Sequence, residues 1–276
     1  MTVISNDKTL FLATKYLADK YLGKLNLPHS KSIVQACRLY TKSGRNRTPY
    51  GMFLLPTVVG QFKVKDAQFI WDKYNTNGVA YDYSCGWGGR LLGALSKGLK
   101  YYGVDTNPTL CERLVECAND YAEVNGLSKD IADIRCVGSE VLQSDWVGKV
   151  GVAFSSPPYF DMEIYPGDKT STVICADYQK WLEEYWKPTV SNACEYLIDG
   201  GYFLVNIADI YYNDMKSVVL SSCPRLKYIC DEYYDGGLTN RNGYRHQRDI
   251  GAKKPNPERI MVFQKVENIK PHEGGN

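Results

Sequence analysis

The sequence predicts an α/β fold built on a mostly parallel sheet of seven strands, with helices on both faces. From about residue 78 onward, seven short apolar runs have the character of strands, and most of them are separated by segments with helical spacing. Strands that alternate with helices are typical of a parallel sheet covered on both faces. Of the 276 residues, 44% are hydrophobic and 23% charged, which is the composition of a globular protein that can bury its own core.

The individual elements follow from local spacing. Residues 1–40 have helix-like spacing, and the basic segment 41–51 is a predicted loop. Further helices are predicted at 65–76, 89–99, 108–126 and 177–201, the last kinked near Pro188. Strands are predicted at 78–84, 100–106, 131–138, 148–156, 201–209, 225–234 and 258–266. The last two strands bracket a basic loop and can pair antiparallel at one sheet edge.

We therefore divide the chain into an N-terminal helical and loop region, 1–60, and a main domain, 61–276, with a small loop at 232–256. The net charge of +2 neither demonstrates nor excludes a nucleic-acid partner. The 22 tyrosines suit either the edge of a core or a surface on which bases stack.

The cysteines and histidines predict neither a disulfide framework nor a metal site. The nine cysteines are scattered without a C-x-x-C pair, and the three histidines lack the spacing of metal ligands. The sequence shows no secretory apolar segment and no apolar run of membrane length. We therefore expect a reduced, cytoplasmic protein without a membrane partner.

A glycine-rich turn, YDYSCGWGGRLLGAL (81–95), joins the first predicted strand of the sheet to a helix. Gly86 and Gly88 allow a sharp bend and a close approach to a ligand. Their spacing matches neither the dinucleotide fingerprint nor a phosphate-binding loop. Asp105 ends the next strand, where a carboxylate can accept from both ribose hydroxyls. Its alternative role is to cap the helix that begins at Pro108, which Asn107 can do as well. This pattern suits a nucleoside cofactor such as S-adenosylmethionine (SAM).

The segment SSPPYF (155–160) follows the fourth predicted strand. Its prolines stiffen the backbone, so that the Ser156 side chain and the Pro157 carbonyl can accept both N–H groups of an exocyclic amine. These bonds draw the nitrogen toward tetrahedral geometry and aim its lone pair at an electrophilic methyl group. Stacking of the base on Tyr159 holds it still, for roughly 1–3 kcal/mol, and positioning supplies most of the rate.

Together, YDYSCGWGGR and SSPPYF resemble the amino-methyltransferases that methylate adenine N6 or cytosine N4 in DNA, whose pattern is D-x-F-x-G-x-G followed by [DNS]-P-P-[YFW]. The resemblance covers about residues 78–210 and implies a Rossmann-like SAM methyltransferase fold. It implies Ser156, Pro157, Pro158 and Tyr159 as the catalytic tetrapeptide; members with serine first are mostly cytosine-N4 enzymes. It implies SAM contacts from Asp82, Ser84, Cys85, Gly86, Gly88, Asp105, Thr106, Ser139 and Glu140.

The sequence departs from this family at Tyr83 and Trp87, which replace commoner residues, and at Arg90, whose carboxylate partner would be the cofactor's or the protein's own. A large target-recognition region is also missing. Base and phosphate contacts are instead expected from the basic segment 236–254, with plain solvated surface as the alternative. Its candidate residues are Arg241, Tyr244, Arg245, Arg248 and Lys253. A second basic loop, at 42–47, is a weaker candidate.

The expected function is therefore SAM-dependent methylation of a DNA base, with cytosine N4 favoured and adenine N6 as the near alternative. Methylation of RNA or a free nucleotide, and a non-catalytic module that binds nucleic acid, remain open. The expected partner is DNA, duplex or single-stranded, in a bacterial or phage-infected cell, and a homodimer and a restriction partner are open alternatives. A base within a duplex would have to leave the stack.

Overall fold

The computed structural model describes residues 62, 64–158, 160, 175, 177–207, 209–234 and 258–267. It is an α/β structure whose seven described strands have the order β3-β2-β1-β4-β5-β7-β6. The chain divides into two compact units. The described residues of the first unit are 62, 64–72 and Cys85–Cys136, and those of the second are Lys73–Ser84, 137–158, 160, 175, 177–207, 209–234 and 258–267. The predicted N-terminal region 1–60 lies outside the described residues.

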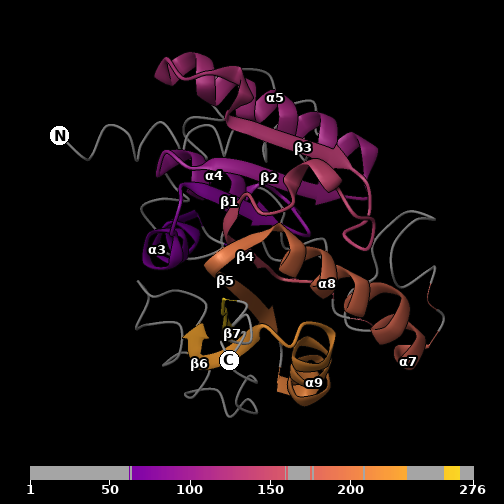
Figure 1. Cartoon of the computed structure of the whole chain (residues 1–276). Coiled ribbons are helices and arrows are strands. Elements are labelled where there is room, and N and C mark those ends of the chain that lie inside the picture. The colour runs from indigo at the N-terminus through magenta and orange to yellow at the C-terminus, as the bar shows by residue number, and fades with distance from the viewer. Residues whose placement is uncertain are drawn as a thin grey trace, which may run out of the picture. The chain divides into compact units, whose positions relative to one another are not determined.

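In the first unit, β2 (Lys100–Asp105) and β3 (Ala132–Cys136) pair in parallel. The helices α4 (Gly89–Ser96) and α5 (Pro108–Asn125) pack on these strands, and Figure 1 shows α5 alongside β3. Asn107 caps α5, because its Oδ1 accepts from the Leu110 backbone N–H at 3.1 Å. A short 3₁₀ turn, Lys129–Ile131, precedes β3.

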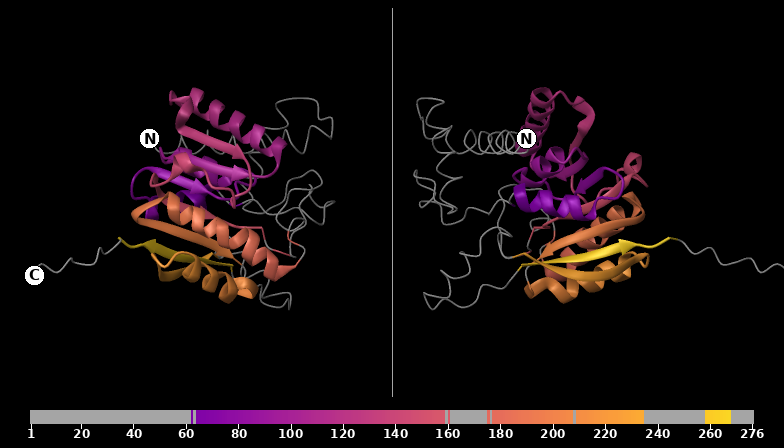
Figure 2. Two further views of the ribbon diagram at one scale, coloured as in Figure 1. Left: turned by 45° about the vertical axis from the view of Figure 1, so that its right-hand side comes forward. Right: turned by 90° about the vertical axis from the view of Figure 1, so that its left-hand side faces the viewer.

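In the second unit, β1 (Val79–Asp82), β4 (Val150–Ser155) and β5 (Leu197–Ile207) pair in parallel. Strand β7 (Glu258–Lys265), yellow in Figure 2, lies antiparallel between β5 and β6 (Leu226–Tyr234). The predicted antiparallel pairing of the two late strands is confirmed. The sheet is therefore mixed rather than all parallel, since β7 runs antiparallel to both of its neighbours. Two consecutive strands such as β6 and β7 can pair in parallel only if a crossover connection joins them.

The helices of the second unit differ from the prediction at two points. A π-helical turn, Leu182–Trp186, separates α7 (Tyr178–Trp181) from α8 (Lys187–Tyr196), which confirms an irregularity beside Pro188. However, the predicted helix does not continue to 201, since β5 already begins at Leu197. Helix α9 (Tyr212–Ser222) was not predicted. Short 3₁₀ turns lie at Ser144–Trp146 and Asp209–Tyr211, and α3 (Val64–Tyr74) runs from the first unit into the second.

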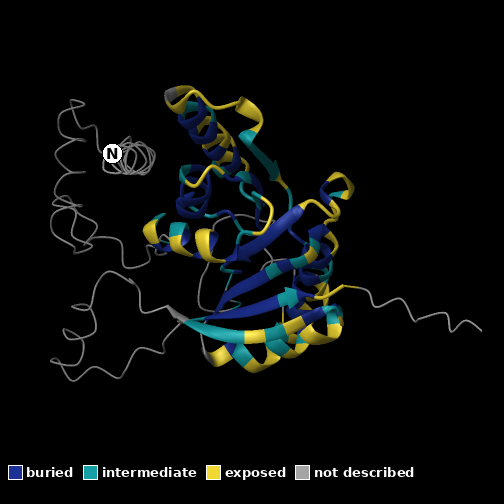
Figure 3. Cartoon of the chain, turned by 60° about the vertical axis from the view of Figure 1, so that its left-hand side comes forward, coloured by how far each residue is buried: buried dark blue, intermediate teal, exposed yellow. Residues whose placement is uncertain are grey.

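Several tyrosines belong to the core. In the second unit Tyr81 is fully buried, and its ring makes an edge contact with Tyr196 at 5.0 Å between centroids. Figure 3 shows buried residues along the strands and exposed residues on the outer sides of the helices. Within the part of the chain that the structure describes, no helix combines the length and apolar character that crossing a membrane requires.

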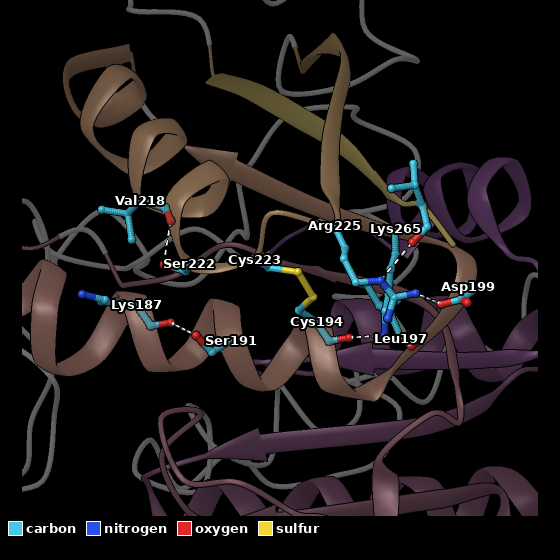
Figure 4. The surroundings of a disulfide bond; sticks show 11 residues. Lys187, Ser191, Cys194, Leu197, Asp199, Val218, Ser222, Cys223, Arg225 and Lys265 are labelled. Atoms are coloured by element: carbon cyan, nitrogen blue, oxygen red, sulfur yellow. Dashed lines mark hydrogen bonds and ion pairs between the residues drawn. A yellow bond between two sulfur atoms is a disulfide. The ribbon is translucent and has the colours of Figure 1, made fainter. Parts of the chain in front are cut away.

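The cysteine prediction is wrong at one pair. A disulfide joins Cys194, near the end of α8, to Cys223, just after α9 (Figure 4). The two cysteines are 29 residues apart and their Cα atoms 6.4 Å apart, within the usual range. The sequence contains no spacing motif that predicts this pair, because the two cysteines come together only through the packing of α8 on α9. Beside it, the buried Lys265 Nζ donates to the carbonyls of Cys194 and Leu197 at 2.7 and 2.6 Å, which satisfies the end of α8.

Candidate active site

The glycine turn lies against the end of β2 in the first unit. The Cys85 N–H donates to the Val104 carbonyl at 3.0 Å, and the Gly86 N–H donates to Asp105 Oδ2 at 3.0 Å. Gly86 and Gly88 have φ angles of 53° and 83°, a left-handed conformation that favours glycine. The structure thus brings together the predicted cofactor residues Cys85, Gly86 and Asp105.

Two close approaches explain the glycines around this turn. A Cβ on Gly88 would stand 2.7 Å from Leu114 Cδ2, and one on Gly103 would stand 2.5 Å from Cys85 Sγ. The Tyr101 hydroxyl donates to that sulfur at 3.4 Å. The Cys85 side chain is therefore buried against β2, so a ligand at the turn would meet the backbone of this residue.

The Asp105 carboxylate is half-buried and organises the loop after β2. Its Oδ2 accepts from Gly86, while its Oδ1 accepts from the Asn107 N–H at 3.1 Å. Asn107 caps α5, so the capping role that was the alternative for Asp105 is filled by its neighbour. The adjacent Thr106 is half-buried, and its carbonyl accepts from Cys136 Sγ at 3.9 Å.

The thiol beside this loop is not activated. Burial, and then the negative charge of Asp105, raise the pKa of Cys111 to about 12. Its Sγ donates to the Asp105 carbonyl at 3.4 Å. A thiol that stays protonated at neutral pH is a poor nucleophile, so the loop is suited to binding rather than to covalent catalysis.

In the second unit, the end of β1 is tied to β4 and β5. Asp82 is fully buried, and its Oδ1 accepts from the Ser84 N–H at 3.2 Å. The Tyr83 hydroxyl lies 3.1 Å from the Ser155 carbonyl and 2.8 Å from the Leu204 carbonyl, positioned to donate to both. This explains the departure at Tyr83, which directly follows β1 and whose buried hydroxyl connects it to the backbones of β4 and β5.

The predicted catalytic tetrapeptide begins directly after β4. Ser156 and Pro158 are half-buried and Pro157 is buried. The Asn206 Nδ2, near the end of β5, donates to Ser156 Oγ at 2.9 Å. Tyr159 lies outside the described residues.

The next described residue, Phe160, contacts the aromatic side chains of α7. Its ring centroid lies 5.6 Å from that of Tyr178 and 6.3 Å from that of Trp181. Burial, with a smaller contribution from Asp214, raises the pKa of the Tyr178 hydroxyl. Phe160 thus fixes the far side of the S-P-P-Y segment to the helix that follows it.

Ser139 and Glu140 lie after β3, in the second unit. Ser139 is buried; its Oγ hydrogen-bonds with Thr189 Oγ1 at 2.8 Å, and its carbonyl accepts from Asn192 Nδ2 at 2.9 Å. The Ser139 hydroxyl is therefore engaged by α8. Glu140 is half-buried, and its carboxylate folds back over the α-carbon of Gly138, where a Cβ would lie 2.1 Å from Oε1.

The remaining candidates lie elsewhere. Arg90 is buried in the first unit, with its guanidinium 5.7 Å from the centroid of the Phe62 ring. The five nucleic-acid candidates, Arg241, Tyr244, Arg245, Arg248 and Lys253, lie outside the described residues, as does the loop at 42–47.

Three features of the site were not predicted from the sequence. They are Asn206, Phe160 and the hydrogen bonds of the Tyr83 hydroxyl to β4 and β5. The only signal for Asn206 was one polar residue within the apolar run FLVNI.

No protein-family model matches the chain, and no curated protein sequence matches it. Among solved structures, it is similar to a TehB-like SAM-dependent methyltransferase from Corynebacterium glutamicum, at 16% identity over 86% of this chain and 98% of that one, with a TM-score of 0.47. It is similar to a putative SAM-dependent methyltransferase from Listeria monocytogenes, at 10% identity over 74% and 98%, with a TM-score of 0.48. The geranyl diphosphate C-methyltransferase of Streptomyces coelicolor A3(2) is 13% identical over 73% and 79%, with a TM-score of 0.47. Likenesses of this degree do not identify the activity or the substrate of this chain.

Proposed function

We propose that this chain is a SAM-dependent methyltransferase that methylates an exocyclic amine of a DNA base, with cytosine N4 as the favoured acceptor. One observation carries the proposal: the serine of an S-P-P-Y sequence stands directly after the buried strand β4, where its hydroxyl accepts a hydrogen bond from a buried amide at 2.9 Å. Such a site offers fixed hydrogen-bond acceptors on a stiff backbone, which is what activation of a weakly nucleophilic amine needs.

The residues of the glycine turn fit the cofactor. Asp105 offers carboxylate oxygens toward ribose hydroxyls while it holds the Gly86 N–H. At Gly88 a side chain would meet Leu114, so the backbone is left bare at the start of α4. Asp82 and Ser84 immediately precede the turn in the chain. SAM, when bound, supplies an electrophilic methyl group on a sulfonium.

The residues of the second unit would then orient the acceptor. The Ser156 hydroxyl and the Pro157 carbonyl accept the two N–H groups of the amine, so that its lone pair leaves conjugation with the ring. A nitrogen–carbon bond forms as the carbon–sulfur bond breaks, and the sulfur keeps the bonding electron pair. The nitrogen then loses its extra proton to water. Tyr159 is the proposed stacking partner of the base.

The basic segment 236–254 is the proposed DNA contact, since its cationic side chains suit phosphates and its Asn, Gln and Arg residues suit base edges. Serine at the first tetrapeptide position favours cytosine N4 through the resemblance to the amino-methyltransferases. Adenine N6 is served by the same chemistry, because it too is an exocyclic amine beside a ring nitrogen.

The test is the identity of the product. The full chain is incubated with methyl-labelled SAM and mixed-sequence DNA, which is then digested to nucleosides and analysed by mass spectrometry, with Ser156→Ala as the control of reduced activity. Labelled N4-methylcytosine supports the proposal, and N6-methyladenine corrects the base. Unlabelled DNA overturns it: calorimetry with SAM then separates an enzyme for RNA or nucleotides, which binds SAM, from a degenerate module, which does not.

A further inference from the structure

Asn206 stands one residue before the end of β5 and is only 2% exposed. It belongs to neither motif that predicted the site, yet its Nδ2 donates directly to Ser156 Oγ at 2.9 Å. We propose that Asn206 is a positioning residue, which holds the Ser156 hydroxyl in the orientation that accepts the amine. This inference rests on the proposed function.

The backbone on both sides of Asn206 makes it a rigid donor. Strands β4 and β5 run in parallel with Ser155 opposite Val205, so Ser156 and Asn206 follow at the same edge of the sheet. On its other side, Asn206 is paired with Ile260 of β7. A polar side chain held within a central strand defines a direction more accurately than one carried by a loop.

The donation changes what Ser156 can offer. A serine hydroxyl has two acceptor lone pairs and one proton, and it rotates to suit its surroundings. With one lone pair occupied by the Asn206 amide, the hydroxyl keeps one acceptor lone pair and its proton, in a fixed orientation. An amine N–H that approaches then meets an acceptor already in place, so no rotational freedom is lost during the reaction. Asn206 itself exchanges no proton and forms no covalent bond.

The experiment is a double-mutant cycle between the two side chains. Asn206→Ala removes the donor, while Asn206→Asp keeps the size of the side chain and, when ionised, accepts instead of donating. Each is measured alone, and Asn206→Ala is also combined with Ser156→Ala. Gln264→Ala is the matched control: it removes another amide of the second unit, which donates to the Gly200 carbonyl at 3.1 Å. The readouts are kcat and KM for DNA, SAM affinity by calorimetry, and the urea midpoint of unfolding.

We expect kcat to fall about tenfold in both Asn206 variants, equivalent to about 1.4 kcal/mol, with SAM affinity retained. Asn206→Ala should lower kcat no further when Ser156 is already alanine, and the same lack of additivity should appear in the urea midpoints. Gln264→Ala should leave kcat unchanged. A kcat unaltered in both Asn206 variants, or additive effects in the cycle, would overturn the positioning role.

The urea cycle separates this inference from the proposed function. If the unaltered chain methylates a base and the cycle is additive, the function stands and the role of Asn206 is wrong. If the urea midpoints show coupling but the unaltered chain transfers no methyl group to any base, the hydrogen bond is real and both the function and the positioning role fall. If Asn206→Ala alone fails to fold, kcat and SAM affinity of Asn206→Asp test the positioning role.

Discussion

Ser155, the last residue of β4, donates its side-chain hydroxyl to the backbone carbonyl of Ser84 across 3.2 Å. Ser155 is fully buried, while Ser84, whose carbonyl accepts the bond, is half-buried. The bond joins the strand that leads into the S-P-P-Y segment to the residue that leads into the glycine turn. Both predicted motifs are therefore approached by chain segments that are tied together within the second unit.

Ser155→Ala should lower the free energy of unfolding by about 1–2 kcal/mol, because the Ser84 carbonyl loses a buried donor. Urea unfolding measures the change. The matched control is Ser221→Ala, since Ser221 is exposed and donates only to the Val218 carbonyl of its own helix. The free energy of unfolding of that variant should stay within about 0.5 kcal/mol of the value for the unaltered chain. Equal losses in the two variants would mean that the hydrogen bond between Ser155 and Ser84 stabilises the fold no more than an exposed serine does.

Asp105→Asn should weaken SAM binding by at least about tenfold, or about 1.4 kcal/mol. The two oxygens of the carboxylate accept from Gly86 and Asn107, and an amide must turn its NH₂ group toward one of these donors. Titration calorimetry gives the affinity. Asp133→Asn, which alters a carboxylate paired with Arg135 on β3, should bind SAM as the unaltered chain does. Equal affinity in both variants would remove Asp105 from the cofactor site.

Gly88→Ala should destabilise the chain more than Gly98→Ala. Both glycines have positive φ, 83° and 72°, and an alanine there costs roughly 1–2 kcal/mol in backbone strain. Only at Gly88 does the new Cβ meet a neighbour, Leu114 Cδ2 at 2.7 Å; at Gly98 it meets nothing within 4 Å. The clash adds about 1–3 kcal/mol. Urea unfolding of the two variants isolates this difference, and equal midpoints would mean that Leu114 moves aside freely.

Glu232→Gln should lower stability at neutral pH but not in acid. Burial raises the pKa of Glu232, but the ion pair with Lys73 and the hydrogen bond from the Tyr74 hydroxyl at 2.7 Å outweigh this, so its pKa is lowered. A lowered pKa means that the ionised carboxylate contributes stability above the unfolded pKa, and that this contribution disappears as the pH falls through the folded pKa.

For this partly exposed group we expect a loss of about 0.5–1 kcal/mol at pH 7, measured by urea unfolding, which shrinks as the pH falls below about 4.5, the ordinary pKa of a glutamate. Glu183→Gln, which removes the exposed pair with Lys187 on one helix surface, should change little at either pH. A difference for Glu232→Gln that persists undiminished in acid would contradict the assigned pKa direction.

Local patterns predicted most of the described elements, because strands and helices have different hydrophobic periods that a single segment displays by itself. The strand expected at 148–156 is β4, Val150–Ser155, and the helix expected at 108–126 is α5, Pro108–Asn125. The end of α8 was misjudged, since the apolar residues Leu197 and Ile198 suit a helix and a strand equally. Helix α9 has a weaker apolar stripe than α5, so its sequence did not predict a helix.

The sequence by itself determined the alternation of strands and helices, the glycine turn and the S-P-P-Y segment, because each is written in consecutive residues. Only the tertiary structure decided which distant groups complete the site. Asn206 lies 50 residues from Ser156, and Tyr83 lies 72 and 121 residues from the carbonyls that its hydroxyl approaches. These partners meet because parallel strands align their carboxyl ends at one edge of a sheet, and the register between strands depends on the packing of the whole unit.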